Sequence, residues 1–175
     1  MIFLMAWQVQ IHRAKPNPAG KDKVYGQPIA KQLLGEWVDL KNVGDAAVSF
    51  STLHLANAEF GPGCQLKRQA QIYWDGPATG ILQPGEIVRV HTGRESDAWQ
   101  MHPDDRSGVH HHAYANSGNF VLNNDCGDHL SVWWKTSGGE WKPEDSTSYD
   151  ANPPEGQVLQ RSGSKLVPVQ SWAAR

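Results

Sequence analysis

The sequence predicts an all-β fold, either a sandwich of two sheets or a barrel, and three observations carry this prediction. Short stretches of alternating apolar and polar residues recur at roughly 8–12-residue spacing, separated by turn signals. The 17 Gly and 11 Pro are spread along the 175 residues, and the eight Trp suit strands. No heptad, internal repeat or low-complexity tract is present. A chain of this size suits one domain with its own core.

The N-terminal part of the chain supplies the first expected strands. Residues Trp7–Arg13 have apolar side chains at every second position, which is typical of a half-buried strand. Residues 14–34 are broken by Pro and Gly and, with the Arg just before them, carry five basic residues against one acid. We predict an irregular basic insertion there. Residues 36–42 and 48–55 alternate again around a Gly-Asp turn, which predicts a hairpin.

The middle of the chain alternates strand and turn signals. Residues 66–74 alternate, but Arg68 interrupts the apolar face, which predicts a strand near a sheet edge. Residues 83–86 have Pro and Gly at the two central positions that a type II turn prefers, and a strand over 87–91 is expected to follow. Residues 93–108 are polar and irregular, and a loop of this length tends to be functional or mobile.

The C-terminal part begins with a strand signal and ends in polar sequence. Residues 110–114 lead into a predicted hairpin over 119–134, in which two apolar runs flank a polar loop. Beyond residue 134 the composition shifts to Ser, Gly, Pro and acids, with five acids against one Lys between residues 140 and 155. We therefore predict a domain over residues 1–134 and an arm over 135–175 that ends in a hairpin.

Charge and hydropathy argue against two classes of protein. The net charge of −2 and the pI near 6.4 lack the basic field of a dedicated nucleic-acid binder. No apolar run approaches the roughly 20 residues that span a bilayer, so no membrane span is expected. The apolar N-terminus has neither a charged start nor a small-residue cleavage site. A cytoplasmic location is expected, with signal-independent export as the alternative.

Three segments of the chain resemble one known family. They are residues 35–42, Gly-Glu-Trp-Val-Asp-Leu-Lys-Asn; residues 82–90, Leu-Gln-Pro-Gly-Glu-Ile-Val-Arg-Val; and residues 119–124, Asn-Phe-Val-Leu-Asn-Asn, with Gly127-Asp128. In order and spacing they resemble the lamin-tail domain, found in nuclear lamins and in many bacterial proteins. The resemblance covers about residues 7–134. It implies an immunoglobulin-like β-sandwich that acts as a binding or assembly module without a catalytic centre.

The two cysteines, Cys64 and Cys126, are too few for a disulfide framework. With Trp74 between them they follow the Cys, Trp, Cys order of antibody-type immunoglobulin domains. However, Asn124 replaces the tyrosine expected two residues before the second cysteine, and both cysteines lie in turn-like sequence. We therefore expect free thiols in loops, with a disulfide as the alternative.

The histidines are candidate metal ligands, because three of the eight are consecutive at residues 110–112. On a strand His110 and His112 share a face, and His91, His102, Asp104 or Asp105 would be needed to complete a zinc set. The preferred interpretation is a polar strand face with no metal and no cofactor. Because no hydrolase motif is present, no catalytic residues are predicted and the protein is not expected to be an enzyme. A small metal-dependent hydrolase that uses the histidine-rich strand is kept as an alternative.

Aromatic residues on outward strand faces are the candidate binding surface. Trp37, Tyr73 and Trp133 are expected to form a platform for a partner protein or a sugar, unless the arm covers them. The opposite charges of insertion and arm predict contact within one molecule or between neighbours. The predicted function is a non-catalytic interaction or structural module that binds a protein partner or forms a homo-oligomer. A carbohydrate- or nucleic-acid-contacting module is the alternative, with nucleic acid disfavoured by charge.

Overall fold

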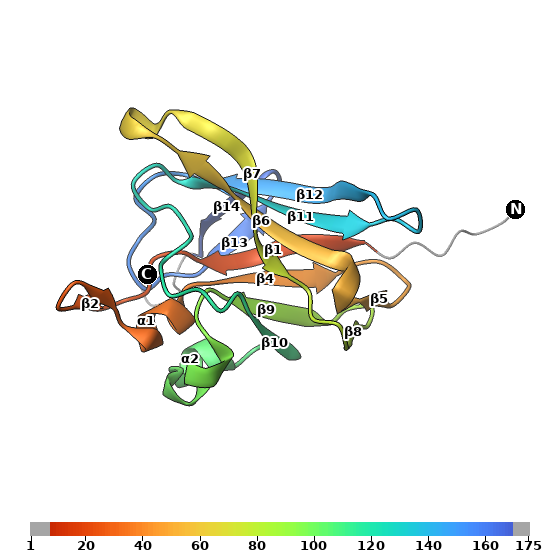
Figure 1. Ribbon diagram of the computed structural model, residues 1–175, viewed down its shortest axis with the longest axis horizontal. Helices are drawn as coiled ribbons and strands as arrows, with labels where there is room; N and C mark the ends of the chain where they lie inside the picture. The colour runs from red at the N-terminus through yellow and green to blue at the C-terminus, as the bar shows by residue number, and fades with distance from the viewer. Residues whose placement is uncertain (1–7, 170–175) are drawn as a thin grey trace, which may run out of the picture.

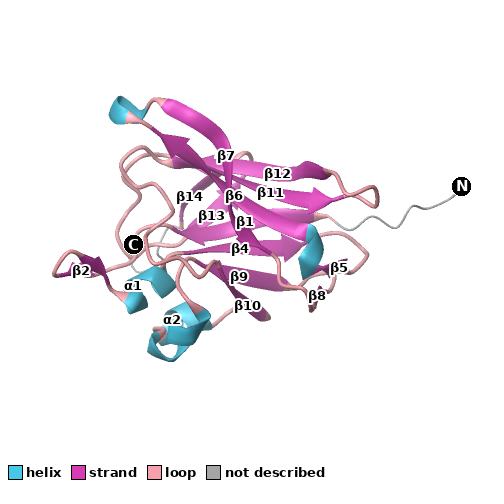
Figure 2. Cartoon of the chain, in the orientation of Figure 1, coloured by secondary structure: helices cyan, strands magenta, loops and turns pink. Residues whose placement is uncertain are grey.

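The computed structural model describes residues 8–169, and these residues form a mainly β structure. It consists of one ten-stranded sheet, two two-stranded sheets and short helical turns at the periphery (Figure 2). The predicted all-β class is confirmed. No helix within residues 8–169 is long and apolar enough to cross a membrane.

The large sheet places strands from both ends of the chain side by side. Its strands, in spatial order, are β10 (His111–Tyr114), β9 (Ile87–His91), β4 (Trp37–Asn42), β1 (Val9–Lys15), β13 (Leu159–Ser162), β14 (Lys165–Pro168), β12 (Trp141–Tyr149), β11 (Asp128–Lys135), β6 (Leu53–Phe60) and β7 (Leu66–Asp75). The small sheets pair β2 (Lys23–Val24) with β3 (Gln27–Pro28), and β5 (Val48–Ser49) with β8 (Ile81–Leu82). Neighbours in the large sheet are antiparallel except β9 with β10 and β12 with β14.

The large sheet folds over so that its two halves enclose one core (Figure 1). Strand β1 also lies close to β12, whose Asp145 carboxylate accepts a hydrogen bond from the Ile11 N–H at 2.9 Å. The buried side chains from the first half are Val9, Ile11, Val38, Leu40, Val88 and Val90, and those from the second are Leu53, Leu55, Trp74, Leu130 and Val132. Each such apolar side chain stabilises the fold by about 1.5–3 kcal/mol relative to its exposed state. The alternation in the sequence therefore marks the faces that meet in the core.

Most predicted strands are confirmed in position. β1, β4, β7 and β9 match the predicted ranges to within two residues, although Trp7 lies outside the described residues. β7 is an outermost strand of the large sheet, as Arg68 indicated. The predicted Pro-Gly turn is also present: the Glu86 N–H donates to the Gln83 carbonyl at 3.0 Å, and Gly85 has a φ of +83°.

Both of the predicted central hairpins are wrong. β4 pairs with β1 and β9 and not with the segment that follows it, which instead forms β5 against β8 and then β6. Residues 120–122 form no strand, because the N–H groups of Val121 and Leu122 donate to the Glu36 side chain. β11 pairs with β12 and β6 instead. β4 and β11 therefore have other partners than the sequence suggested: β4 lies between β1 and β9, and β11 lies between β12 and β6.

The segments predicted to be irregular are more ordered than expected. The insertion over residues 14–34 contains the β2–β3 hairpin and most of helix α1 (Ala30–Gly35). The loop over residues 93–108 contains the 3-10 helix η3 (Glu95–Gln100) and helix α2 (Pro103–Arg106). The predicted arm supplies β12, β13 and β14 to the large sheet, with β12 between β14 and β11, and its terminal hairpin is β13–β14.

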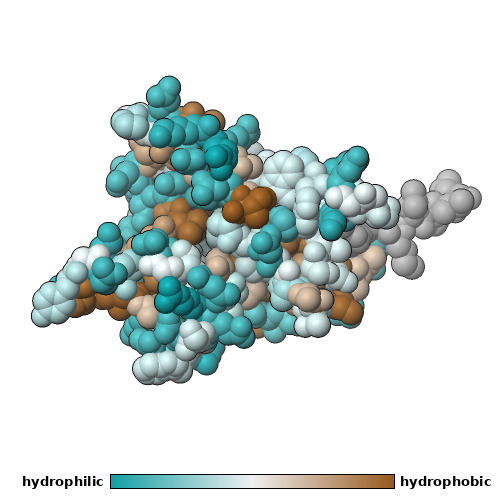
Figure 3. Space-filling model, viewed as in Figure 1, coloured by the Kyte–Doolittle hydropathy of each residue, from teal (hydrophilic) through white to brown (hydrophobic). Residues whose placement is uncertain are grey.

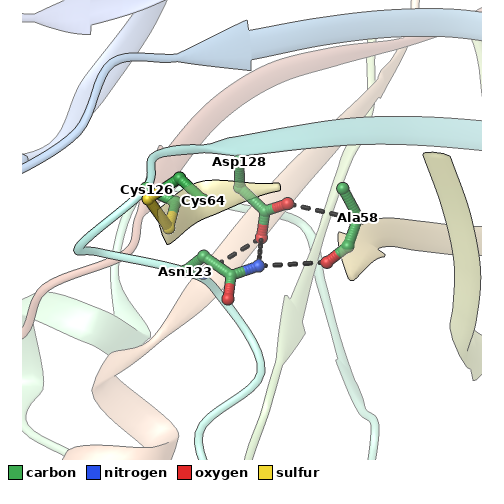
Figure 4. Close-up of a disulfide and its surroundings, with 5 residues drawn as sticks. All are labelled: Ala58, Cys64, Asn123, Cys126 and Asp128. Carbon is green, nitrogen blue, oxygen red and sulfur yellow. Dashed lines mark hydrogen bonds between the residues drawn. A yellow bond between two sulfur atoms is a disulfide. The ribbon is translucent and has the colours of Figure 1, made fainter. Parts of the chain in front are cut away.

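The expectation of free thiols is wrong, because Cys64 and Cys126 form a disulfide (Figure 4). The sulfur atoms are 2.07 Å apart, and the bond joins the turn after β6 to the loop before β11. The turn-like surroundings misled the sequence interpretation. The two turns meet because the Asp128 carboxylate accepts hydrogen bonds from both Ala58 and Asn123 beside them.

Candidate functional site

Glu36 is a fully buried carboxyl group that links β4 to the loop before β11. One oxygen accepts hydrogen bonds from the Thr92 hydroxyl at 2.6 Å and from the N–H groups of Val121 and Leu122 at 2.9 and 3.1 Å. The other oxygen is buried and has no hydrogen-bond partner among the described residues. Burial raises the pKa of Glu36 to about 7, so the side chain retains a proton in the folded state at near-neutral pH.

This raised pKa predicts that Glu36 stabilises the fold less at alkaline than at acidic pH. In the unfolded chain Glu36 loses its proton near its ordinary pKa of 4.5, whereas the folded protein holds it up to about pH 7. The contribution is fully present below pH 4.5 and is lost as the pH rises through 7. We expect the free energy of unfolding of the wild type, taken relative to that of Glu36→Gln, to fall by up to about 3 kcal/mol across this range, because all other titrating groups are common to the two proteins. Urea unfolding of the wild type and Glu36→Gln at a series of pH values measures it, and parallel profiles would contradict it.

Asp128 organises the same loop from its other end (Figure 4). One carboxylate oxygen accepts from the N–H groups of Ala58 and His129 at 2.9 and 2.8 Å. The other accepts from the N–H and the side-chain amide of Asn123, both at 3.0 Å, and from the Asn57 amide at 3.2 Å. A carboxylate with five donors holds the fold together and is not a free acid or base for catalysis.

Asn42 joins the first resemblance segment to the second. Its N–H donates to the Glu86 carbonyl at 3.0 Å, and its carbonyl accepts from Gly85 at 2.7 Å. Its side-chain amide donates to the Leu82 and Ala46 carbonyls at 3.0 and 2.8 Å. The sequence analysis identified the segments but missed the roles of these polar side chains. The sequence signal that could have indicated these roles is the polar residue at each end of β4, Glu36 and Asn42.

Trp37 is not part of an exposed platform, because it is only 2% exposed. Its indole N–H donates to the Asp105 carboxylate at 2.8 Å. The Arg89 guanidinium lies 3.5 Å from the ring centroid and donates to both carboxylate oxygens of Asp39, at 2.7 and 2.9 Å. The expectation failed because residues around α2 cover the second face of β4. This cluster supports the fold.

Tyr73 is also unsuited to the predicted platform. The residue is half-buried and packs against the core. Burial raises the pKa of its hydroxyl well above the ordinary value. Its ring borders a small hollow beside Phe120 and Val121. The side chain therefore points mainly inward, where alternation had predicted an outward face, because the pairing of β6 with β7 contains register shifts.

Trp133 is the predicted aromatic residue that lies on an open groove. The groove has a volume of about 420 Å³ and runs over the outer face of β11, between β7 and β12. Its lining includes Gln69 and Ala70 from β7, His129, Ser131 and Trp133 from β11, and Pro143 and Ser146 from β12. The indole N–H of Trp133 donates to the Ser131 hydroxyl at 2.9 Å. Volumes of roughly 300–1,000 Å³ are typical of small-molecule sites.

The four candidate histidines do not converge on one point. Only His91 and His112 meet, with His91 Nε2 2.8 Å from His112 Nδ1. His91 Nδ1 lies 2.6 Å from the Leu34 carbonyl, so both of its ring nitrogens are engaged. Burial lowers the pKa of His91 to about 3, which keeps its ring neutral.

The remaining histidines have separate local roles. His102 Nδ1 accepts a hydrogen bond from the Asp104 N–H at 3.1 Å at the start of α2, and His110 Nδ1 accepts one from Ile87 at 3.0 Å. His112 Nε2 lies 3.0 Å from the Arg106 carbonyl. Within residues 8–169, no three His, Cys, Asp or Glu side chains form a group that could hold a metal ion.

The basic insertion and the acidic segment meet within one molecule. The Gly20 N–H donates to the Glu155 carboxylate at 2.7 Å, and the Asn17 side-chain amide donates to the Pro153 carbonyl at 3.0 Å. Lys15, at the start of the insertion, pairs with Asp105 at 2.6 Å. Part of the positive charge considered for nucleic-acid binding is therefore used inside the fold.

A scan against protein-family models and a search of curated proteins found no match to this chain.

The geometry divides the candidate site residues into two groups. Glu36, Asn42 and Asp128 hold the fold together, and Trp37 and Tyr73 are packed against it. Trp133 lines an open groove on the outer face.

Proposed function

We propose that the chain is a non-catalytic interaction module that binds its partner through the groove beside Trp133. The observation that carries this proposal is the contrast between the buried and the open groups. Glu36 and Asp128, two buried carboxyl groups in the segments that carry the family resemblance, accept hydrogen bonds within the fold. The outer groove combines an aromatic ring with polar side chains, the usual composition of a ligand site.

The proposal includes an immunoglobulin-like β-sandwich that resembles the lamin-tail domain. Two half-sheets face one core, which suits such a sandwich. The three resemblance segments also contact one another: Glu36 reaches the third segment, and Asn42 reaches the second. These contacts give a physical reason for the segments to occur together. The disulfide differs from the antibody arrangement, because it joins peripheral turns and not the two central layers.

Two alternatives receive less support from the described residues. A histidine-based hydrolase would need His91 to release Nε2 from His112 before that nitrogen could bind a metal, and no three candidate ligands gather there among residues 8–169. Self-assembly between the insertion and the acidic segment receives less support, because the two segments contact each other within one molecule through Asn17 and Gly20. Binding through the outer groove would not require any of these contacts to break.

The proposed function is tested with three immobilised proteins: the wild type, Trp133→Ala and Trp99→Ala. Trp99 is the matched control, because it is 79% exposed and does not line the groove. After exposure to an extract of the source organism, bound proteins are quantified by mass spectrometry and bound sugars by monosaccharide analysis. We expect one ligand to be retained by the wild type and Trp99→Ala and reduced at least about tenfold by Trp133→Ala.

Two results would contradict the proposal. Equal retention by all three proteins would remove the groove from the binding surface. Turnover of model esters or phosphoesters by the purified wild type would show a catalytic function instead.

A further inference from the structure

The groove beside Trp133 contains polar side chains that the fold does not use. Within residues 8–169, the side chains of Gln69, His129 and Ser146 make no hydrogen bond, although all three line the groove. Together an amide, an imidazole and a hydroxyl offer both donors and acceptors. They come from β7, β11 and β12, three strands of one hydrogen-bonded sheet, so their backbone positions are fixed before any ligand arrives.

The Trp133 ring is held in place by its own polar atom. Its N–H donates to Ser131, two residues away on the same face of β11, at 2.9 Å. This hydrogen bond satisfies the indole N–H, so a ligand would contact Trp133 through the apolar surface of its ring. Pro143 lies opposite Trp133 in the β11–β12 register and adds a second rigid apolar surface to the groove. The apolar part of the site is thus preformed.

The lining carries no formal charge from acids, lysines or arginines. None of its eight residues is Asp, Glu, Lys or Arg. A phosphate or carboxylate ligand would find no Arg or Lys partner there, and a cationic ligand would find no carboxylate. A purely apolar ligand would cover Gln69, His129 and Ser146 without replacing their hydrogen bonds to water, which costs free energy. The remaining ligand class is neutral, with many hydroxyl groups and an apolar face.

We infer that this groove binds a neutral saccharide, with a sugar ring packed on Trp133 and its hydroxyl groups bonded to Gln69, His129 and Ser146. A pyranose ring presents a face of C–H groups and a rim of hydroxyl groups, which matches the two kinds of surface in the groove. The inference rests on the proposed function, because it names the ligand class of the same site. A protein partner at the groove is the other outcome of the test.

The test uses the full chain and a panel of soluble neutral polysaccharides: dextran, pullulan, laminarin, hydroxyethylcellulose, galactomannan and xylan. Affinity gel electrophoresis identifies a polysaccharide that retards the wild type, and calorimetry with oligosaccharides of that polymer measures the affinity. We expect at least about a tenfold loss for Trp133→Ala and a smaller loss for Gln69→Ala, since the ring supplies most of the contact area. The affinity is expected to be unchanged between about 0.05 and 0.5 M NaCl, because no ion pair forms.

Two variants serve as controls for folding and for the chemistry of the ring. Trp99→Ala should bind like the wild type, and Trp133→Tyr, which keeps an aromatic face, should retain part of the affinity. Circular dichroism confirms that each variant is folded. If no polysaccharide in the panel binds, or if Trp133→Ala binds as well as the wild type, the saccharide assignment is overturned. Protein capture that depends on Trp133 would then still support the proposed function, whereas capture independent of Trp133 would remove both.

Discussion

Replacing Arg89 with Met is expected to lower the free energy of unfolding by about 3–5 kcal/mol, because it leaves a buried carboxylate without its main partner. Asp39 is fully buried, and Arg89 donates to both of its carboxylate oxygens. Arg13 also contacts Asp39 at 2.9 Å, but its side chain is partly exposed and compensates only in part. Arg89 additionally donates to the Asp105 and Ser107 carbonyls, so the substitution also frees the residues around α2.

A surface ion pair provides the matched control for this prediction. Lys165 pairs with Asp150 at 2.6 Å, and both side chains are largely exposed. Lys165→Met should change the free energy of unfolding by no more than about 1 kcal/mol, because solvent screens exposed pairs. Urea unfolding monitored by tryptophan fluorescence measures both variants. Similar small effects for the two substitutions would show that Asp39 is not isolated from water as described.

The double substitution Cys64→Ser and Cys126→Ser is expected to have an effect of comparable size. The disulfide closes a loop with a sequence separation of 62 residues, and removing such a constraint from the unfolded chain costs about 4 kcal/mol of stability. The wild type in excess reductant should unfold at the same urea concentration as the double variant. A midpoint that is unaffected by reductant, together with two free thiols on labelling of the oxidised protein, would contradict the bond.

The disulfide also bears on the compartment in which the protein is found. Bonds of this kind persist in oxidising compartments and are rare in the cytosol. We therefore propose oxidising surroundings for this chain, in place of the cytoplasmic location expected from the sequence. Thiol alkylation of protein recovered from its native source tests this, because cysteines blocked before reduction and labelled after it support the proposal.

The strands were largely predictable, because alternation reports directly which side chains face the core. Val38 and Leu40 are buried as expected. The same pattern could not show that Trp37 and Asp39, on the other face of β4, are buried too. Their cover comes from Arg89 and from residues around α2, distant segments whose position depends on tertiary packing. Alternation predicts which face of a strand is buried in the core, but it does not predict whether other segments cover the opposite face.

The groove was predictable only in part. The sequence placed Trp133 on an outward face, and the structure puts it on an open surface. Gln69 could not be associated with it, because β7 reaches the groove only through the pairing of β6 with β11, two segments that are distant in the chain. Ser146 was missed because the sequence analysis assigned its segment to an arm, whereas the segment forms β12 beside β11. The disulfide was missed for the same reason, since its two turns are separated by the whole of β7 to β10.

Surface hydropathy is in keeping with the proposed binding at a limited site. On the face shown in Figure 3, hydrophobic residues form separate small areas among hydrophilic ones. Large continuous apolar areas are typical of permanent interfaces. The face in view therefore fits a protein that binds locally and is not covered by a permanent partner there.

The way the large sheet ends has a consequence for behaviour at high concentration. Its two outermost strands are β10, which has only four residues, and β7, which carries exposed Lys67 and Arg68 and pairs irregularly with β6. Short length, positive charge and local distortion each hinder the templated addition of a strand from another copy. Crowded copies of this chain should accordingly resist conversion into fibrils, even though the described residues already contain many strands.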